Sequence, residues 1–203
     1  MASGERITAV ERPGLHLMPK IVSEQAFDGA EAIIARLGLD ELLAEVRQIV
    51  TTFELLVEER RDANGTAGLR SIIDQRFRSA GGWVQKKTGG VDWIKRQAIN
   101  GRPRHICIGV EVQVSGRSDV MSVDLIHLRQ ELLQGRIDLA VLIVPSDRLG
   151  YFLTDRVARL SEAKRHIEMA RAEDMPFVLI AIEHDGPGPA LKKQFRKSTA
   201  PRQ

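Results

Sequence analysis

The sequence predicts a mixed α/β protein in which helices cover both faces of one sheet. Residues 139–144 and 177–182 are uniformly apolar, as in strands with two buried faces. Residues 106–114 alternate between branched apolar side chains and small or polar ones, which indicates a strand with two different faces. Residues 40–57 repeat apolar side chains at intervals of three and four, which indicates a helix. Strand and helix segments then alternate toward the C-terminus, so we expect a partly parallel sheet.

The N-terminal part is predicted to be a helical elaboration of this sheet. Residues 6–17 are expected to form a short strand pair or an extended arm. Three helices are expected to follow, over residues 23–37, 40–57 and 67–79. Gly38 is expected to close the first helix, because glycine readily adopts the left-handed conformation of a helix C-cap.

The next segment is predicted to be an antiparallel meander over residues 83–87, 91–98 and 106–114. Asn100-Gly101 separates the last two segments, and Asn-Gly is a strong sign of a two-residue hairpin turn. Such a turn places Asp92 opposite Gly109, on the same face as Glu111 and one diagonal step from it. The hairpin therefore predicts two carboxylates and the amide of Gln113 on one surface, which is suitable for binding a cation; the alternative is a strand whose second face is wet.

The remaining segments are predicted to be a helix over residues 120–133, a strand at 139–144, a helix over 154–173 and a strand at 177–182. Among the apolar side chains of the first of these helices, we expect Val123, Ile126 and Leu133 to be buried. We expect one domain over residues 1–185, with a helical part at 20–80 and a sheet region at 83–183. A flexible basic tail is expected over residues 186–203.

Composition limits the class of protein without fixing it. The chain has 203 residues, 43% of them hydrophobic, which is enough for a full core. A single cysteine, Cys107, excludes an internal disulfide framework and any cysteine-built zinc site, and it fits a cytoplasmic location. The net charge of +3 is compatible with a nucleic-acid partner but does not demand one. No GxxxxGK[ST], GxGxxG or HExxH motif occurs.

The order of these motifs resembles the PD-(D/E)xK nuclease superfamily. Asp92 followed by Glu111-Val-Gln113 is similar to the active-site pattern of type II restriction endonucleases of the BglII/BstYI branch. In that branch a glutamine replaces the usual lysine, giving ExQ. The resemblance covers roughly residues 64–183 and implies a restriction-endonuclease-like mixed sheet flanked by helices. It also implies that the helix at 67–79 can lend an acid, for which Asp74 is the candidate; the alternative is a solvated helix acid.

The resemblance implies roles for the residues that match its pattern. Asp92 and Glu111 would be catalytic, and they would bind Mg²⁺ together with the main-chain carbonyl of Val112. Mg²⁺ prefers oxygen ligands and retains several waters, and it can polarise a phosphoryl oxygen and lower the pKa of a bound water. Gln113 would also be catalytic, but its amide can only orient the water, since it is neither a general base nor a cation.

Double-stranded DNA is the implied partner, bound mainly through phosphates. We expect contacts from the segment that follows the strand at 106–114 and from basic residues near the hairpin. These are Ser115, Arg117, Ser118, Asp119, Lys95, Arg96 and Arg102. Arg117 is the candidate for reading guanine; the alternative for its segment is a polar turn before a helix. A palindromic target, for which a GATC-centred site is a guess from close relatives, would imply a two-fold homodimer.

Three functions are compatible with these residues. The first is a Mg²⁺-dependent type II restriction endonuclease, which would have a DNA methyltransferase as its genetic partner. The second is a nuclease of the same fold with a repair or mobile-element role. The third is a non-catalytic DNA-binding protein that retains the fold. The set of Asp92, Glu111 and Gln113 favours the first two, because a buried acid is costly unless it is paired or metal-bound.

Overall fold

The computed structural model describes residues 20–86, 90–98, 105–115, 118–154 and 156–192. Its main feature is a six-stranded sheet in the order β1-β7-β6-β5-β4-β3. The elements are, in chain order, β1 (Lys20–Ala26), α1 (Ala30–Leu37), α2 (Asp40–Thr51), β2 (Leu56–Val57), α3 (Thr66–Ser79), β3 (Val84–Gln85), β4 (Trp93–Ala98), β5 (His105–Val112), the 3-10 helix η1 (Ser118–Val120), α4 (Met121–Leu133), β6 (Leu139–Pro145), α5 (Asp147–Phe152), α6 (Leu160–Met169), the 3-10 helix η2 (Ala172–Asp174), β7 (Phe177–Glu183) and β8 (Gly186–Pro187).

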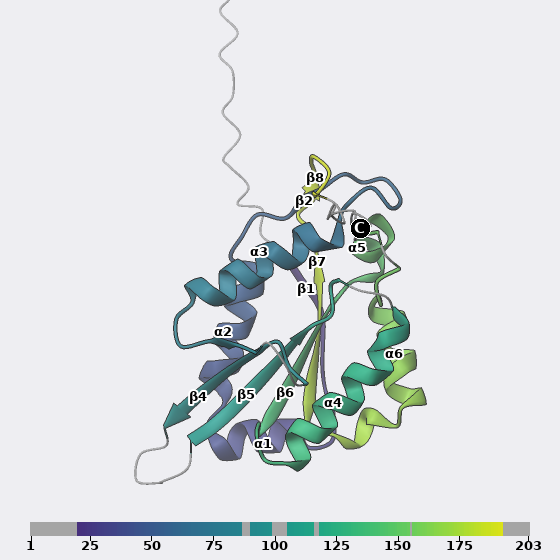
Figure 1. Ribbon diagram of the computed structural model, residues 1–203. Coiled ribbons are helices and arrows are strands. Elements are labelled where there is room, and N and C mark those ends of the chain that lie inside the picture. Colours follow the sequence, from purple (N-terminus) through teal and green to yellow (C-terminus); the bar gives the residue numbers. More distant parts are fainter. Residues whose placement is uncertain (1–19, 87–89, 99–104, 116–117, 155, 193–203) are drawn as a thin grey trace, which may run out of the picture.

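The sheet is mixed, as the sequence predicts. The central strands β5, β6 and β7 run parallel to one another, whereas β4 is antiparallel to β5 and β1 is antiparallel to β7. The carboxyl ends of the three parallel strands therefore meet at one edge of the sheet (Figure 1). In open α/β sheets that edge is where ligands usually bind.

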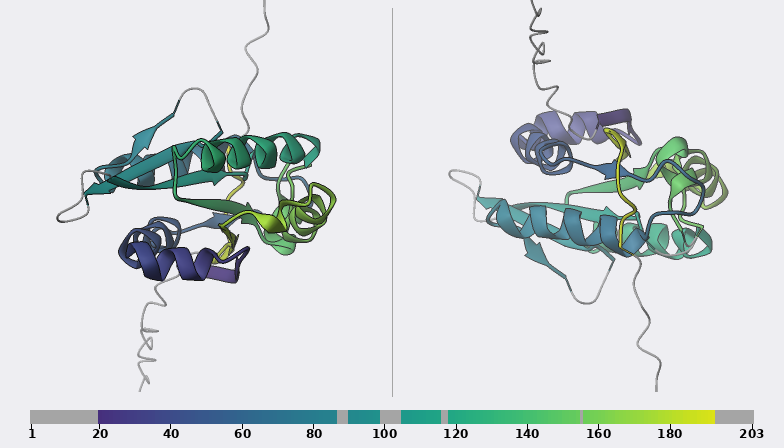
Figure 2. Two further views of the ribbon diagram at one scale, coloured as in Figure 1. Left: turned by 90° about the horizontal axis from the view of Figure 1, so that it is seen from below. Right: turned by 90° about the horizontal axis from the view of Figure 1, so that it is seen from above.

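Helices cover both faces of the sheet, which confirms the predicted fold class. Figure 2 shows α1 and α2 on one side of the strands and α4 on the other. Two hydrophobic clusters correspond to these faces: Ile108 and Val110 of β5 pack with α1, α2 and α3, whereas Cys107 packs with α4 and α6. The alternation in β5 thus produces two different faces, and both are buried along most of the strand.

The register of the hairpin differs from the predicted one by two residues. Trp93 pairs with Val110 and Ala98 pairs with His105, so Asp92 does not lie opposite Gly109. The proposed turn at Asn100-Gly101 falls outside the described residues. Because side chains alternate with a period of two, a shift of two residues keeps every side chain on its predicted face.

The N-terminal part is less helical than predicted. Residues 23–26 belong to β1, an edge strand antiparallel to β7, and α1 begins only at Ala30. Gly38 closes α1 as predicted, with φ 68° and its N–H directed to the carbonyl of Ile34. The second predicted helix ends at Thr51 instead of residue 57. Residues 6–17, the predicted strand pair or arm, lie outside the described residues.

The predicted helix over residues 120–133 exists as η1 and α4, but its burial was predicted wrongly. Val123, Ile126 and Leu133 are exposed by 47%, 52% and 79%. The buried side chains of α4 are instead Met121, Leu125, Leu128 and Glu131. The helix expected over residues 154–173 is restricted to α6, and α5 precedes it. Both fully apolar strands, now β6 and β7, are buried as predicted.

The chain after β7 continues onto the domain. β8 pairs with β2 in parallel, and the N–H of Leu191 donates to Oδ1 of Asn64 at 3.1 Å. Residues 186–188 and Leu191 of the predicted tail therefore contact the domain. The predicted domain boundaries stay a prediction. Among the described residues, none of the helices combines the length and the apolar character that crossing a membrane requires.

Candidate functional site

The two predicted acids meet at the carboxyl end of β5. Asp92 immediately precedes β4, and its N–H donates to the carbonyl oxygen of Val110 at 3.0 Å. The Oδ2 atom of Asp92 accepts a hydrogen bond of 2.8 Å from the N–H of Val112. The side chain of Asp92 also interacts with that of Glu111, both through its charge and through a hydrogen bond. The two acids therefore lie close together where β4 begins and β5 ends.

Glu111 lies in an environment that opposes its ionisation. Burial, and then the negative charges of Asp92 and Asp124, raise the pKa of Glu111 well above its usual range, although Arg70 acts in the opposite direction. A like charge disfavours the ionised form of a neighbouring carboxyl group. Burial and the two neighbouring acids therefore oppose a negative charge on Glu111 more strongly than Arg70 favours it.

Gln113 and α4 form the second part of the site. Gln113 is 5% exposed, and its Nε2 donates a short hydrogen bond to Oδ2 of Asp124 on α4. Burial raises the pKa of Asp124, and the hydrogen bond from Gln113 opposes that shift. Asp124 was not predicted from the sequence. The signal available was its place in α4 next to Leu125, which is part of the hydrophobic core.

α4 also packs closely against the chain just before Asp92. A Cβ atom on Gly90 would lie 2.6 Å from the main-chain carbonyl of His127 in α4. Such a distance is shorter than real Cβ contacts, so glycine permits the observed approach of helix and chain. α4 is thereby fixed relative to both Asp92 and Gln113.

α3 supplies a cation and a further acid. Arg70 lies on α3, and its guanidinium contacts three groups: Oδ1 of Asp92 at 2.6 Å, Oδ1 of Asp74 at 3.0 Å and the carbonyl oxygen of Val112 at 2.9 Å. Asp74 also accepts a hydrogen bond of 3.0 Å from Nε1 of Trp93. Asp74 is thus beside the acids, as the sequence analysis considered, but it is bound to Arg70 and Trp93. The sequence analysis missed Arg70.

We use the name candidate site for this group of side chains. Its members are Arg70, Asp74, Asp92, Glu111, Gln113 and Asp124.

The oxygen atoms of this site fit a hard divalent cation. The neighbouring carboxyl groups of Asp92 and Glu111 and the carbonyl of Val112 form an all-oxygen donor set. Burial and the charges of Asp92 and Asp124 raise the pKa of Glu111, and a bound cation would oppose that shift. In the described part of the chain, no three or more His, Cys, Asp or Glu side chains converge as a metal-binding group. Two carboxylates and one carbonyl are enough for Mg²⁺, which keeps several waters.

The predicted DNA-contact residues are only partly placed. Arg102 and Arg117 lie outside the described residues. Lys95 does not join the acids: its Nζ binds Glu45 of α2 at 2.7 Å. Arg96 is exposed near Cys107. The N–H of Ser118 donates to the carbonyl of Arg156. Asp119 lies in η1, and Ser115 lies three residues after the end of β5.

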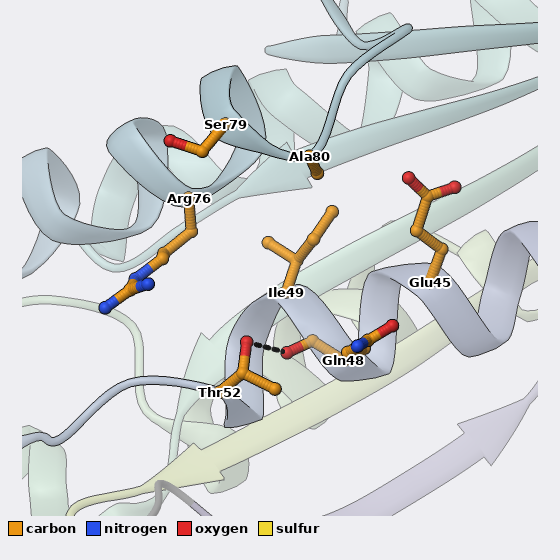
Figure 3. A pocket seen from close by; sticks show the side chains of 7 residues that line it. All are labelled: Glu45, Gln48, Ile49, Thr52, Arg76, Ser79 and Ala80. Carbon is orange, nitrogen blue, oxygen red and sulfur yellow. Dashed lines mark hydrogen bonds between the residues drawn. The ribbon is translucent and has the colours of Figure 1, made fainter.

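A separate cavity of about 300 Å³ lies between α2 and α3. Figure 3 shows residues of its lining, with Gln48 of α2 and Thr52 at the end of that helix on one side and Arg76 and Ser79 of α3 on the other. None of the described residues of the candidate site lines it. We therefore attach the candidate function to the acids at the edge of the sheet and not to this cavity.

The mixed six-stranded sheet with helices on both faces is consistent with a restriction-endonuclease-like fold. A sequence model of the family described as restriction endonuclease BamHI matches residues 20–194, and the chain belongs to that family. The type II restriction enzyme BamHI of Bacillus amyloliquefaciens is 31% identical over 101 residues. That similarity spans 49% of this chain and 45% of the relative, so just under half of each protein. The predicted type II restriction endonuclease resemblance is confirmed at this level, and the BglII/BstYI branch stays a prediction.

Proposed function

We propose that the protein is a Mg²⁺-dependent, sequence-specific endonuclease that hydrolyses phosphodiester bonds of double-stranded DNA. The observation that carries this proposal is the adjacency of Asp92 and Glu111 at the end of a buried strand, with Gln113 two residues beyond. Membership in a restriction endonuclease family supports the same reaction. A site with this charge excess favours catalysis over a purely structural role.

The chain's own residues have distinct tasks in this reaction. Asp92, Glu111 and the Val112 carbonyl would hold Mg²⁺, which supplies a Lewis acid for the phosphoryl oxygen and an acidified water. The Nε2 atom of Gln113 is engaged by Asp124, so the amide oxygen of Gln113 remains to accept a hydrogen bond from the attacking water. Asp124 is then a positioning residue, because it fixes the orientation of the Gln113 amide.

The proposal includes a two-fold homodimer, since a palindromic target requires one active site for each strand. The apolar side chains of Val123, Ile126 and Leu133 support it, because they are exposed along one side of α4. Met169 at the end of the neighbouring α6 is also 69% exposed. An exposed group of large apolar side chains is typical of an interaction surface. A second copy of the chain is the partner that we propose for it.

The target sequence belongs to the same proposal. If the chain resembles the BglII/BstYI branch in specificity, its target is a palindrome centred on GATC, and Arg117 is the candidate for reading guanine. A DNA methyltransferase that modifies the same sequence would be its genetic partner.

The test is incubation of unmethylated plasmid and phage DNA with the protein and millimolar Mg²⁺, with EDTA as the control. We expect discrete bands that require Mg²⁺, and sequencing of their ends gives the target and the cut position. Nicks or a smear would instead favour a nuclease with a repair or mobile-element role. Salt-sensitive DNA binding without any cleavage would favour a non-catalytic DNA-binding protein.

A further inference from the structure

Arg70 binds two oxygen atoms that the proposed function assigns to Mg²⁺. Its guanidinium binds Oδ1 of Asp92 at 2.6 Å and the carbonyl oxygen of Val112 at 2.9 Å. These are two of the three oxygen ligands that the proposed function assigns to Mg²⁺. Arg70 is also 21% exposed and anchored by Asp74 at 3.0 Å, so these contacts belong to a partly buried network.

Neither oxygen of the Asp92 carboxylate is free of a hydrogen bond. Oδ2 accepts from the N–H of Val112 at 2.8 Å, and Oδ1 accepts from Arg70. The N–H of Val112 belongs to β5, the strand between β4 and β6 in the sheet, and cannot withdraw without moving that strand. The guanidinium of Arg70 ends a long, flexible side chain. When a cation approaches Asp92, Arg70 is therefore the partner that can leave.

We propose that Arg70 is a built-in counter-cation that holds Asp92 and the Val112 carbonyl in the metal-free protein and must leave them before a divalent cation binds. The inference rests on the proposed function, since it concerns the same ligands. A guanidinium donates hydrogen bonds to the lone pairs that a metal ion would use. Arg70 and the metal ion thus compete, and Arg70 weakens metal binding to the DNA-free protein.

The experiment measures metal affinity without DNA, so it does not depend on cleavage. The DNA-free protein is titrated with Mn²⁺ by isothermal calorimetry, with Arg70→Gln as the variant. We expect Arg70→Gln to bind Mn²⁺ roughly tenfold or more tightly than the wild type, because a competing charge has left the ligands. An affinity equal to or weaker than that of the wild type overturns the inference, since a merely structural arginine would give that result.

Arg76→Gln is the matched control, because Arg76 lies on the same helix and is exposed beside the cavity between α2 and α3 (Figure 3). It should bind Mn²⁺ as the wild type does. Asp92→Asn, made in both the wild type and Arg70→Gln, separates the two proposals. If it abolishes Mn²⁺ binding while Arg70→Gln changes nothing, only the inference on Arg70 fails. If it leaves binding unchanged, the assigned metal ligands are wrong and the proposed chemistry fails.

A second measurement covers the case in which Arg70→Gln does not fold. In wild-type protein labelled with ¹⁵N-arginine, the side-chain resonance of Arg70 is identified by its loss in Arg70→Lys. Saturating Mg²⁺ should shift or broaden that resonance as the guanidinium leaves Asp92. A resonance that does not change at saturation overturns the inference.

Discussion

Two polar clusters lie at the same edge of the sheet and differ in their charge balance. The candidate site lies at the end of β5, and a second group, which we call the histidine cluster, lies at the ends of β6 and β7. The members of the histidine cluster are Glu59, Ser146, Arg148, Glu183 and His184. The first cluster has four carboxyl groups and one guanidinium, which binds only two of them, Asp74 and Asp92. In the second, two carboxylates are bound by a histidine and an arginine.

The pKa of one carboxyl group in each cluster is shifted, and the two shifts have opposite directions. Burial and neighbouring acids raise the pKa of Glu111, whereas the hydrogen bond from His184 lowers the pKa of Glu59. The side chain of His184 is fully buried, and both of its ring nitrogens contact carboxylates. In the histidine cluster each carboxylate has a side-chain hydrogen-bond donor, which stabilises the fold. The candidate site holds more acids than its one guanidinium binds and can therefore accept an added cation. Buried polar residues alone thus do not identify the functional cluster; the number of cationic partners for its acids does.

The largest expected effect is on cleavage. Asp92→Asn should lower the rate of DNA cleavage roughly 10³-fold or more, because it removes a metal ligand of the proposed reaction. DNA binding, measured by gel shift in EDTA, should stay largely intact. Glu183→Gln in the histidine cluster is the control and should cut at nearly the wild-type rate per folded molecule. Wild-type cleavage by Asp92→Asn would show that the site is assigned wrongly.

In the histidine cluster we expect a substitution to lower stability and to leave cleavage unchanged. His184→Ala should lower the free energy of unfolding by about 2–3 kcal/mol, because it removes a buried side chain and its hydrogen bonds to two carboxylates. Urea denaturation measures this loss, and cleavage per folded molecule should not change. Arg148→Ala, at an exposed ion pair with Glu59, should cost less. A His184→Ala protein that is stable but inactive would contradict the division between the clusters.

A smaller effect on cleavage is expected from the support of Gln113. Asp124→Ala should lower kcat about 10- to 100-fold, as for other residues that orient a catalytic group. Metal affinity, measured with Mn²⁺, should fall much less than in Asp92→Asn. Arg129→Ala is the matched control on α4, since Arg129 binds Asp174 and not the site. Equal losses in the two variants would mean that α4 is merely destabilised.

The smallest effect concerns stability and its dependence on pH. The pKa of Glu111 is higher in the folded state, so the wild type loses stability as pH rises from the usual carboxyl range toward the raised value. Glu111→Gln lacks this loss and should be more stable in EDTA near neutral pH, by about 1–2 kcal/mol, with little difference near pH 4. Chemical denaturation at several pH values measures it.

Glu59→Gln should show the opposite pH dependence of stability relative to the wild type. The pKa of Glu59 is lowered in the folded state, so its contribution to stability is present above the usual carboxyl range and disappears as pH falls through the lowered value. A parallel trend in both variants would remove the contrast between the clusters.

Much of the fold was predictable because burial follows from side-chain periodicity. The faces of β5 and the uniform burial of β6 follow directly from residues 106–114 and 139–144. β1 was missed because Glu24, Gln25 and Ala26 favour a helix locally, and pairing with the distant β7 overrides that preference. The exposure of Val123 and Ile126 was missed because periodicity shows that a face is apolar, but not what covers it.

The candidate site was predictable only in part. Asp92, Glu111 and Gln113 come together at the end of β5, where Asp92 interacts with Glu111 and with the N–H of Val112. Arg70 gave one sign in the sequence: Asp74 follows it by four residues, the spacing of a helical ion pair. Its contact with the Val112 carbonyl joins residues far apart in the chain. Such a contact depends on how α3 docks and leaves no pattern in the sequence.

α4 has a mechanical consequence for this molecule. Its 13 residues form a rod about 20 Å long. One side of that rod holds Asp124 and approaches Gly90, while another presents Ile126 to the exterior. A rod cannot move at one side and stay fixed at the other, so a force on its outer side is transmitted to Gln113 and to the chain that carries Asp92. Contacts made on the outer surface of α4 can therefore change the geometry of the candidate site.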